Sequence, residues 1–331
     1  MTVPLQGKPV LVTGAGGFIG SHLVEALLHA GARVRAFVRY NSRADTGLLR
    51  FAPQELVNEV EILAGDLRDE DAVRQAVSGC QVVFHLGALI SIPYSYHHPV
   101  EVASTNVMGT LNVLLACRDL GVERVVHTST SEVYGTAQRV PIDESHPLKG
   151  QSPYSASKIG ADKLAESFNC AYGLPVVTVR PFNTYGPRQS ARAVIPTIIT
   201  QALSADTLRL GNLHSTRDFT YVADTVAGFL QAASLPGLEG LTVNLGTGNE
   251  IQIGDLADVI IRKIGRPVKI ELEDSRLRPP DSEVQRLVSD NSLARQSLDW
   301  QPQVSLEEGL ERTIEWIGLH LDSYRVGKYE F

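Results

Sequence analysis

Tyr154 and Lys158 stand four residues apart and could move a proton together. In a helix this spacing puts both side chains on one face. An ammonium group close to a phenol stabilises the phenolate and lowers the pKa of the phenol toward neutrality, so Tyr154 could serve as a general base. Because the spacing also arises by chance, its position after the fifth expected strand carries more weight than the spacing itself.

A hydroxyl and a carboxylate follow that fifth strand, at Thr130 and Glu132. A hydroxyl at the carboxyl end of a strand can bind a hydroxyl of a substrate. A carboxylate beside a dinucleotide pocket disfavours cofactor binding, so its presence there favours a role as a base. The alternative for Glu132 is an ordinary surface glutamate.

Gly14, Gly17 and Gly20 follow the first apolar run and open the first expected helix. In this context the pattern predicts a dinucleotide site. Gly14 permits the tight turn, Gly17 lets the backbone approach a pyrophosphate at the helix N-terminus, and Gly20 allows close packing of helix on strand.

The second expected strand ends in Arg39, with Arg43 nearby, where an acid would bind the ribose of NAD. The two arginines could accept a 2′-phosphate, or they could form a solvated basic loop. We therefore favour NADP slightly over NAD. Asp66 ends the third strand and could either meet the adenine or cap the next helix.

The elements that must position these residues alternate between strand and helix. Strands are expected over 9–13, 33–38, 60–66, 82–86, 125–129 and 176–180, and helices over 21–30, 69–79, 104–120 and 154–172. The pattern predicts an α/β fold: a Rossmann doubly wound parallel sheet with a smaller C-terminal α/β substrate domain. We expect residues 1–182 to form the NAD(P)-binding domain, with a strand and helix near 221–249 returning to it. Residues 183–220 and 250–331 would bind the substrate.

Composition narrows the class of protein. The 331 residues are 43% hydrophobic, which excludes a disordered or fibrous chain, and the net charge of −7 disfavours a non-specific nucleic-acid binder. We find no signal peptide and no apolar run of about 18 residues, so we expect a cytoplasmic protein without a membrane span. The three cysteines are expected to be buried thiols, and the adjacent His97 and His98 point differently on any regular element, so no metal site is expected.

Four motifs carry a resemblance to a known family. They span residues 14–20 (Gly-Ala-Gly-Gly-Phe-Ile-Gly), 154–158, 180–188 (Arg-Pro-Phe-Asn-Thr-Tyr-Gly-Pro-Arg) and 217–224. Together they resemble the extended short-chain dehydrogenase/reductase superfamily that acts on nucleotide sugars, over nearly the whole chain. The triplet 130–132 is similar to that of 4,6-dehydratases of the GDP-mannose type. The run 129–158 is similar to dehydratases of bacterial legionaminic-acid-type pathways.

The resemblance implies a 4,6-dehydratase with tightly bound NAD(P) that is regenerated each turn. Tyr154 would take the proton of the sugar 4-hydroxyl while hydride leaves C4, and Thr130 would hydrogen-bond that oxygen. Glu132 would remove the C5 proton, the 6-hydroxyl would leave as water, and hydride would return to C6. One departure is Ser131, where dTDP-glucose dehydratases have an aspartic acid; the GDP-mannose type has the same serine.

The resemblance also implies the binding residues, a homodimer, and a UDP- or GDP-linked hexose or N-acetylhexosamine as substrate. The expected cofactor contacts are Gly14, Gly17, Phe18, Ile19, Gly20, Arg39, Asp66, Leu67, Leu86, Ala88, Tyr154, Lys158 and Pro181. The expected substrate contacts are Ser131, Asn183, Arg188, Arg217 and Arg278. Asn106 would order active-site water or only bridge a helix.

Three alternatives remain at this stage. A UDP-glucuronate decarboxylase would need a cation for the sugar carboxylate, which Arg276 or Arg278 could supply. A 4-epimerase needs no glutamate at the position of Glu132. A non-catalytic NADP-binding protein would not require the Tyr154–Lys158 pair.

Overall fold

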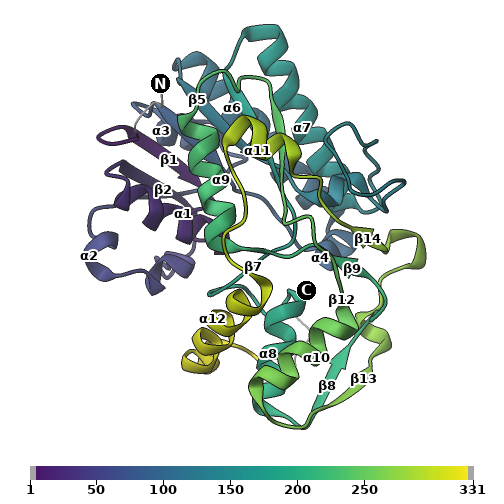
Figure 1. The fold of residues 1–331 in the computed structure, drawn as a ribbon. Helices are drawn as coiled ribbons and strands as arrows, with labels where there is room; N and C mark the ends of the chain where they lie inside the picture. The colour runs from purple at the N-terminus through teal and green to yellow at the C-terminus, as the bar shows by residue number, and fades with distance from the viewer. Residues whose placement is uncertain (1–4, 327–331) are drawn as a thin grey trace.

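A seven-stranded parallel sheet forms the centre of the larger lobe in the computed structural model, which describes residues 5–326 (Figure 1). Its strand order is β11-β6-β5-β4-β1-β2-β3. The strands are β1 (Pro9–Thr13), β2 (Arg33–Arg39), β3 (Glu61–Gly65), β4 (Val82–His85), β5 (Arg124–Thr128), β6 (Val176–Pro181) and β11 (Thr242–Leu245). The expected Rossmann-like α/β fold is confirmed.

Helices cover both faces of this sheet because both faces of its strands are apolar. One layer holds α1 (Phe18–His29), α9 (Val222–Ser234) and α11 (Ser292–Leu298); the other holds α3 (Glu70–Val77), α6 (Gly109–Asp119) and α7 (Pro153–Tyr172). Leu23 and Phe229 are fully buried in the first layer, and Val113 and Phe168 are buried in the second.

A smaller lobe lies beyond the carboxyl edge of the sheet (Figure 1). It contains α8 (Val194–Ser204), α10 (Ile253–Ile264), α12 (Leu306–Leu319) and the parallel pair β8 (Thr207–Leu210) and β13 (Lys269–Leu272). One hydrophobic cluster extends from Leu27 of α1 to Ile198 and Leu256 of this lobe. The two lobes therefore share a core.

Short elements complete the chain. The strands are β7 (Thr184–Tyr185), β9 (Thr216–Arg217), β10 (Thr220–Tyr221), β12 (Ile251–Gln252) and β14 (Arg286–Leu287). The helices are α2 (Gln54–Val57), α4 (Ile92–His97) and α5 (Pro99–Ala103), and η2 (Ser104–Met108) is a short π-helix. The 3₁₀ turns are η1 (Gly47–Phe51), η3 (Ser131–Tyr134), η4 (Asp274–Arg276), η5 (Pro280–Ser282) and η6 (Leu321–Ser323).

Two expectations about apolar residues need correction. The continuous helical run Pro99–Asp119 is long and apolar enough to span a membrane by length and composition. Here the run is only partly buried: Val113 and Cys117 are fully buried in the core, whereas Val100 and Met108 are exposed. Cys80 is also buried, but Cys170 is exposed, because it lies on the outer face of α7.

Candidate active site

Helix α7 positions Tyr154 at the carboxyl edge of the sheet. Ser152 caps the helix: its hydroxyl accepts a hydrogen bond from the Ser155 amide at 3.1 Å. In turn, the Ser155 hydroxyl accepts a hydrogen bond from the Ser152 amide at 3.0 Å. Pro153 follows as the first helical residue. Tyr154 therefore lies in the first turn, with Lys158 one turn further along the same face.

Tyr154 and Lys158 are both buried, but their surroundings do not favour the phenolate form of Tyr154. Lys158 Nζ donates a hydrogen bond to the carbonyl oxygen of Thr128 at 2.7 Å. Burial lowers the pKa of Lys158 to about 8, against the raising effect of the Asp162 charge. Burial also raises the pKa of Tyr154 well above its ordinary value, although a hydrogen bond with Thr130 opposes this. The protein groups alone therefore do not produce the lowered pKa that the spacing suggested.

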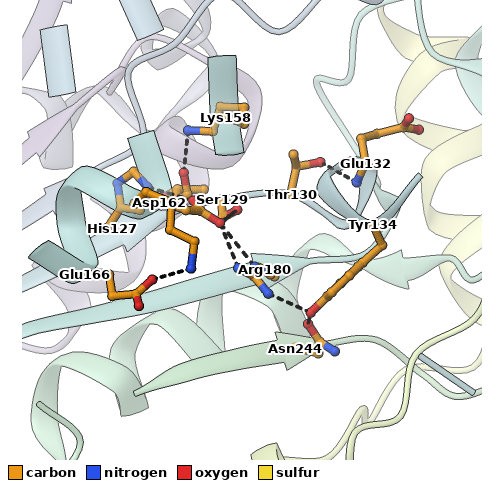
Figure 2. A network of polar contacts seen from close by, with 12 residues as sticks. His127, Ser129, Thr130, Glu132, Tyr134, Lys158, Asp162, Glu166, Arg180 and Asn244 are labelled. Carbon is orange, nitrogen blue, oxygen red and sulfur yellow. Dashed lines mark hydrogen bonds and ion pairs between the residues drawn. The ribbon is translucent and has the colours of Figure 1, made fainter. Parts of the chain in front are cut away.

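Glu132 lies on η3, whose N-cap is Thr130: the Glu132 amide donates to Thr130 Oγ1 at 3.3 Å. Figure 2 shows its side chain turned away from the polar network behind it. Across residues 5–326, the carboxylate of Glu132 is in none of the hydrogen bonds or ion pairs. Its charge still reaches two site residues, since it raises the pKa of both Tyr154 and Arg217.

Two of the expected substrate arginines come together around a glutamate. Arg217 Nη2 lies 3.4 Å from Glu283 Oε1, and Arg278 Nε lies 3.9 Å from Glu283 Oε2. Burial lowers the pKa of Arg217, and the neighbouring Arg278 lowers it further, whereas Glu132 and Glu283 raise it. Sequence reasoning missed Glu283; the only signal was an acid five residues after Arg278. Paired guanidinium groups suit a diphosphate, which they can bind bidentately.

The other expected substrate residues divide into two groups. The Asn183 Oδ1 atom is buried without a hydrogen bond from the described part of the chain, so it can accept one from a ligand. Ser131 is buried in η3. Arg188 does not join Arg217: its Nη2 pairs with Glu25 of α1 at 2.7 Å and also donates to the Phe51 carbonyl oxygen at 3.2 Å. These contacts favour a structural role for Arg188 over the expected contact with substrate.

The glycine-rich turn forms a cradle of the expected kind. Gly14 has φ +70°, and a Cβ there would lie 2.8 Å from the backbone of Gly87. A Cβ at Gly20 would lie 2.2 Å from the Gly14 carbonyl oxygen, but at Gly17 the nearest atom would be 3.1 Å away and the space beyond is open. These residues fit a dinucleotide whose pyrophosphate approaches Gly17. Gly87 was missed, although its neighbours Leu86 and Ala88 were expected.

The remaining expected cofactor residues lie along the same edge of the sheet. Phe18 and Ile19 begin α1, Leu67 follows β3, Leu86 and Ala88 follow β4, and Pro181 ends β6. Arg39 ends β2, with a mostly exposed side chain 3.5 Å from Glu101. Asp66 is paired with Arg68 at 2.6 Å, and this contact lowers the pKa of Asp66 to about 2.

Asn106 has a bridging role. Its Nδ2 atom donates to the Leu89 carbonyl oxygen and to Ser157 Oγ, each at 2.9 Å, and its Oδ1 accepts from the Leu89 amide at 2.8 Å. The side chain thus ties the loop after β4 to α7. Within residues 5–326, no three His, Cys, Asp or Glu side chains are grouped so that they could hold a metal ion.

The fold and the site define an enzyme class: an NAD-dependent Rossmann enzyme of the nucleotide-sugar dehydratase/epimerase type. The family model for GDP-mannose 4,6 dehydratase matches residues 11–313, and the chain belongs to this family.

Relatives within the family carry different activities in their names. A UDP-glucose 4-epimerase from Mycolicibacterium smegmatis is 36% identical, covering 92% of this chain and 97% of its own. An epimerase structure from Methanothermobacter thermautotrophicus has a TM-score of 0.89 at 31% identity, covering 96% and 94%. The dTDP-glucose 4,6-dehydratase from Streptomyces venezuelae, solved with NAD bound, has a TM-score of 0.85 at 30% identity, covering 96% and 99%. The expected particular similarity to legionaminic-acid-type dehydratases is not confirmed by these relatives.

Proposed function

We propose that this protein is a nucleotide-sugar 4,6-dehydratase that makes a 4-keto-6-deoxy sugar. The observation that carries the proposal is the carboxylate of Glu132. It stands beside Thr130, acts electrostatically on Tyr154 and Arg217, and is not engaged by the described protein groups. A carboxylate kept available next to the proton-transfer pair is suited to act as a second base.

The first proton transfer uses Tyr154, Thr130 and Lys158. A nicotinamide cofactor held at the Gly14–Gly20 turn would supply the hydride chemistry at C4 and C6 of the sugar. Tyr154, as a phenolate stabilised by Lys158, accepts the proton of the 4-hydroxyl, and Thr130 hydrogen-bonds the same oxygen. A bound oxidised cofactor would add a positive charge to the site, which would favour the phenolate form of Tyr154 further.

The second proton transfer uses Glu132. The 4-ketone acidifies the C5–H bond, so a carboxylate can remove that proton. The protonated carboxyl group of Glu132 then gives the same proton to the 6-hydroxyl, which leaves as water. This route needs no acid at Ser131, which is buried. The proton that Tyr154 took from O4 balances the one that C5 regains.

The nearest rival is a 4-epimerase, which the relative from Mycolicibacterium smegmatis favours. Epimerisation needs oxidation at C4, rotation of the ketone and return of hydride to C4. It makes no use of a base at C5. Glu132 therefore supports the dehydratase.

The substrate class follows from Arg217 and Arg278. Both arginines stand around one glutamate, so the group carries a net positive charge that suits a nucleoside diphosphate. We propose a UDP- or GDP-linked hexose or N-acetylhexosamine. Asn183, with its buried free acceptor, would receive a hydrogen bond from this ligand.

Mass spectrometry on nucleotide sugars incubated with the purified protein tests the proposal. The set should contain UDP-GlcNAc, GDP-GlcNAc, GDP-mannose, dTDP-glucose and UDP-glucuronate. Loss of one water from a neutral hexose supports the proposal and identifies the substrate. Loss of carbon dioxide from UDP-glucuronate alone would instead establish a decarboxylase. An unchanged mass with an altered retention time would establish an epimerase and overturn the proposal.

Two variants refine this test. Glu132→Gln should still reduce the cofactor at C4 but lose no water, because only the second proton transfer needs the carboxylate. Glu166→Gln, which changes an exposed glutamate on α7, is the matched control and should behave as wild type. Undiminished water loss by Glu132→Gln would refute the mechanism.

A further inference from the structure

Asp162 is a buried carboxylate at the centre of the polar network behind the site (Figure 2). Its Oδ2 accepts hydrogen bonds from Ser129 Oγ at 2.7 Å and from Arg180 Nε and Nη2 at 3.2 and 3.0 Å; its Oδ1 contacts His127 Nε2 at 3.1 Å. Burial would raise the pKa of Asp162, but His127, Arg180 and Lys158 lower it to about 2. The carboxylate is therefore ionised, and the proposed reaction does not use it.

Asp162 continues the helix face that carries the reactive pair. Tyr154, Lys158 and Asp162 stand at intervals of four residues along α7. The Asp162 charge opposes the effect of burial on Lys158, which would otherwise lose its proton more readily. Among residues 5–326, the ammonium of Lys158 donates one hydrogen bond, to the Thr128 carbonyl oxygen.

The buried charged groups have a net positive charge, which one more anion would neutralise. Lys158 and Arg180 are cations and Asp162 is the anion between them. The three together carry one net positive charge, which an ionised Tyr154 would neutralise. Without Asp162 the two buried cations would lack their shared counter-ion, and Lys158 is the one that can lose its proton.

The same carboxylate is linked to the segment that bears Glu132. Arg180 Nη1 donates to the Tyr134 hydroxyl at 2.9 Å, and the Arg180 guanidinium also lies over the Tyr134 ring, 5.1 Å from its centroid. Tyr134 in turn donates to Asn244 Oδ1 at 2.7 Å. Tyr134 is the last residue of η3, so the chain of contacts runs from α7 to the turn that carries Thr130 and Glu132.

We propose that Asp162 is a positioning residue that holds Lys158 as a cation and, through Arg180 and Tyr134, fixes the turn bearing Glu132 relative to α7. One buried group thereby couples the two proton-transfer groups. The part that concerns Glu132 rests on the proposed dehydratase function, whereas the part that concerns Lys158 does not.

The charged and titratable groups around Lys158 come from four elements. They are Tyr154 and Asp162 from α7, His85 from β4 and His127 from β5, together with Arg180 from β6, which is joined to the group through Asp162. His85 bonds Thr13 and Thr110 at 2.8 and 2.9 Å, and burial lowers the pKa of both histidines. Both histidines are therefore neutral at neutral pH, and Asp162 is the anion that holds the lysine charge.

Direct titration of Lys158 in the NAD-loaded protein tests the first part. The probe is lysine labelled with ¹³C at Cε, read by NMR, with Lys158→Met to assign the signal. Asp162→Asn should lower the Lys158 midpoint by about one unit or more, because the neutralised side chain no longer opposes burial. Asp224→Asn is the matched control, since that buried carboxylate binds the amides of Gln303 and Val304 and should leave the midpoint unchanged.

Arg180→Gln keeps the test decisive if Asp162→Asn does not fold. Without the Arg180 cation, the negative charge of Asp162 is balanced by Lys158 alone, so the titration midpoint of Lys158 should rise. An unchanged midpoint in a folded Asp162→Asn or Arg180→Gln protein would overturn the assignment. This readout is independent of the sugar, so it stands even if no nucleotide sugar loses water.

The second part is tested by Tyr134→Phe, which removes the hydroxyl and keeps the ring. The variant should reduce the cofactor at the wild-type rate but lose water several-fold more slowly, with the Lys158 midpoint unchanged. Equal slowing of both steps, or of neither, would show that the Arg180–Tyr134 contact does not position Glu132.

Discussion

Arg188 and Glu25 form an ion pair of 2.7 Å that joins the loop after β7 to helix α1, with only 8% and 19% of their side chains exposed. The chain separation of 163 residues makes this a tie between distant segments. Arg188 also has φ +71°, a conformation that non-glycine residues adopt rarely. The contacts of its guanidinium group therefore secure this backbone turn.

Arg188→Met should destabilise the protein and leave substrate affinity unchanged. Removing one partner of a buried ion pair costs about 3–5 kcal/mol, since the other charge stays buried. Thermal unfolding and KM for the nucleotide sugar are the measurements. Arg217→Met is the comparison and should raise KM strongly; a similar rise for Arg188→Met would restore its expected role in substrate binding.

Activity should fall as pH rises through about 8. The ammonium form of Lys158 exists below its pKa of about 8, and the neutral amine above it cannot stabilise the Tyr154 phenolate. The rate of sugar turnover against pH should therefore show an alkaline limb near this value. Lys158→Arg keeps the charge at every accessible pH, so whatever activity remains should lack that limb. An alkaline limb that persists in Lys158→Arg would assign it to another group.

Tyr154→Phe should bind cofactor and sugar but not oxidise C4. The variant keeps the ring and loses the group that accepts the proton of the 4-hydroxyl. Reduced nicotinamide should not appear in its absorbance spectrum when sugar is added, while equilibrium dialysis of the sugar shows binding within a few-fold of wild type. Cofactor reduction at the wild-type rate would remove Tyr154 from the mechanism.

His22 should make the fold sensitive to acid. Burial lowers the pKa of His22 to about 4, while its ring contacts the Pro187 carbonyl oxygen at 3.0 Å. The unfolded chain therefore binds a proton between about pH 6.5 and 4 that the folded chain does not, so stability falls as pH falls through this window, by at most about 3 kcal/mol. Urea unfolding against pH measures it. His22→Gln should flatten the fall, whereas the exposed His29→Gln should not.

Arg39 should decide the cofactor. We expect NADP to bind at least as tightly as NAD, because the second strand ends in this exposed arginine rather than in an acid. Arg39→Ala should weaken NADP binding about tenfold or more and leave NAD binding unchanged. Calorimetric titration of cofactor-free protein compares the two. Equal losses for both cofactors, or tighter NAD binding by wild type, would contradict the preference.

The sequence predicted the central sheet and the Tyr154–Thr130–Glu132 group because strand ends of a parallel sheet meet at one edge. The sequence pattern did not predict contacts between segments that are far apart in the chain. Arg188 stands in a motif that predicted substrate binding, and no neighbouring residue in the sequence indicates that Glu25 is its partner. Asp162 was overlooked as well, although its place eight residues after Tyr154 continues the same helix face. A periodicity indicates a face of a helix, but it does not indicate which buried donors gather there.

The outermost strand of the sheet next to β6 is β11, which comes from residues 242–245. The chain thus leaves the larger lobe after β6, builds part of the smaller lobe, and returns to close the sheet. A fragment ending at residue 182 would leave unpaired the edge of β6 that β11 covers. Unpaired strand edges can associate with other chains. Shortened or engineered versions of the protein should therefore keep both lobes together, and a change of specificity is better sought by exchanging loops than by exchanging the C-terminal half.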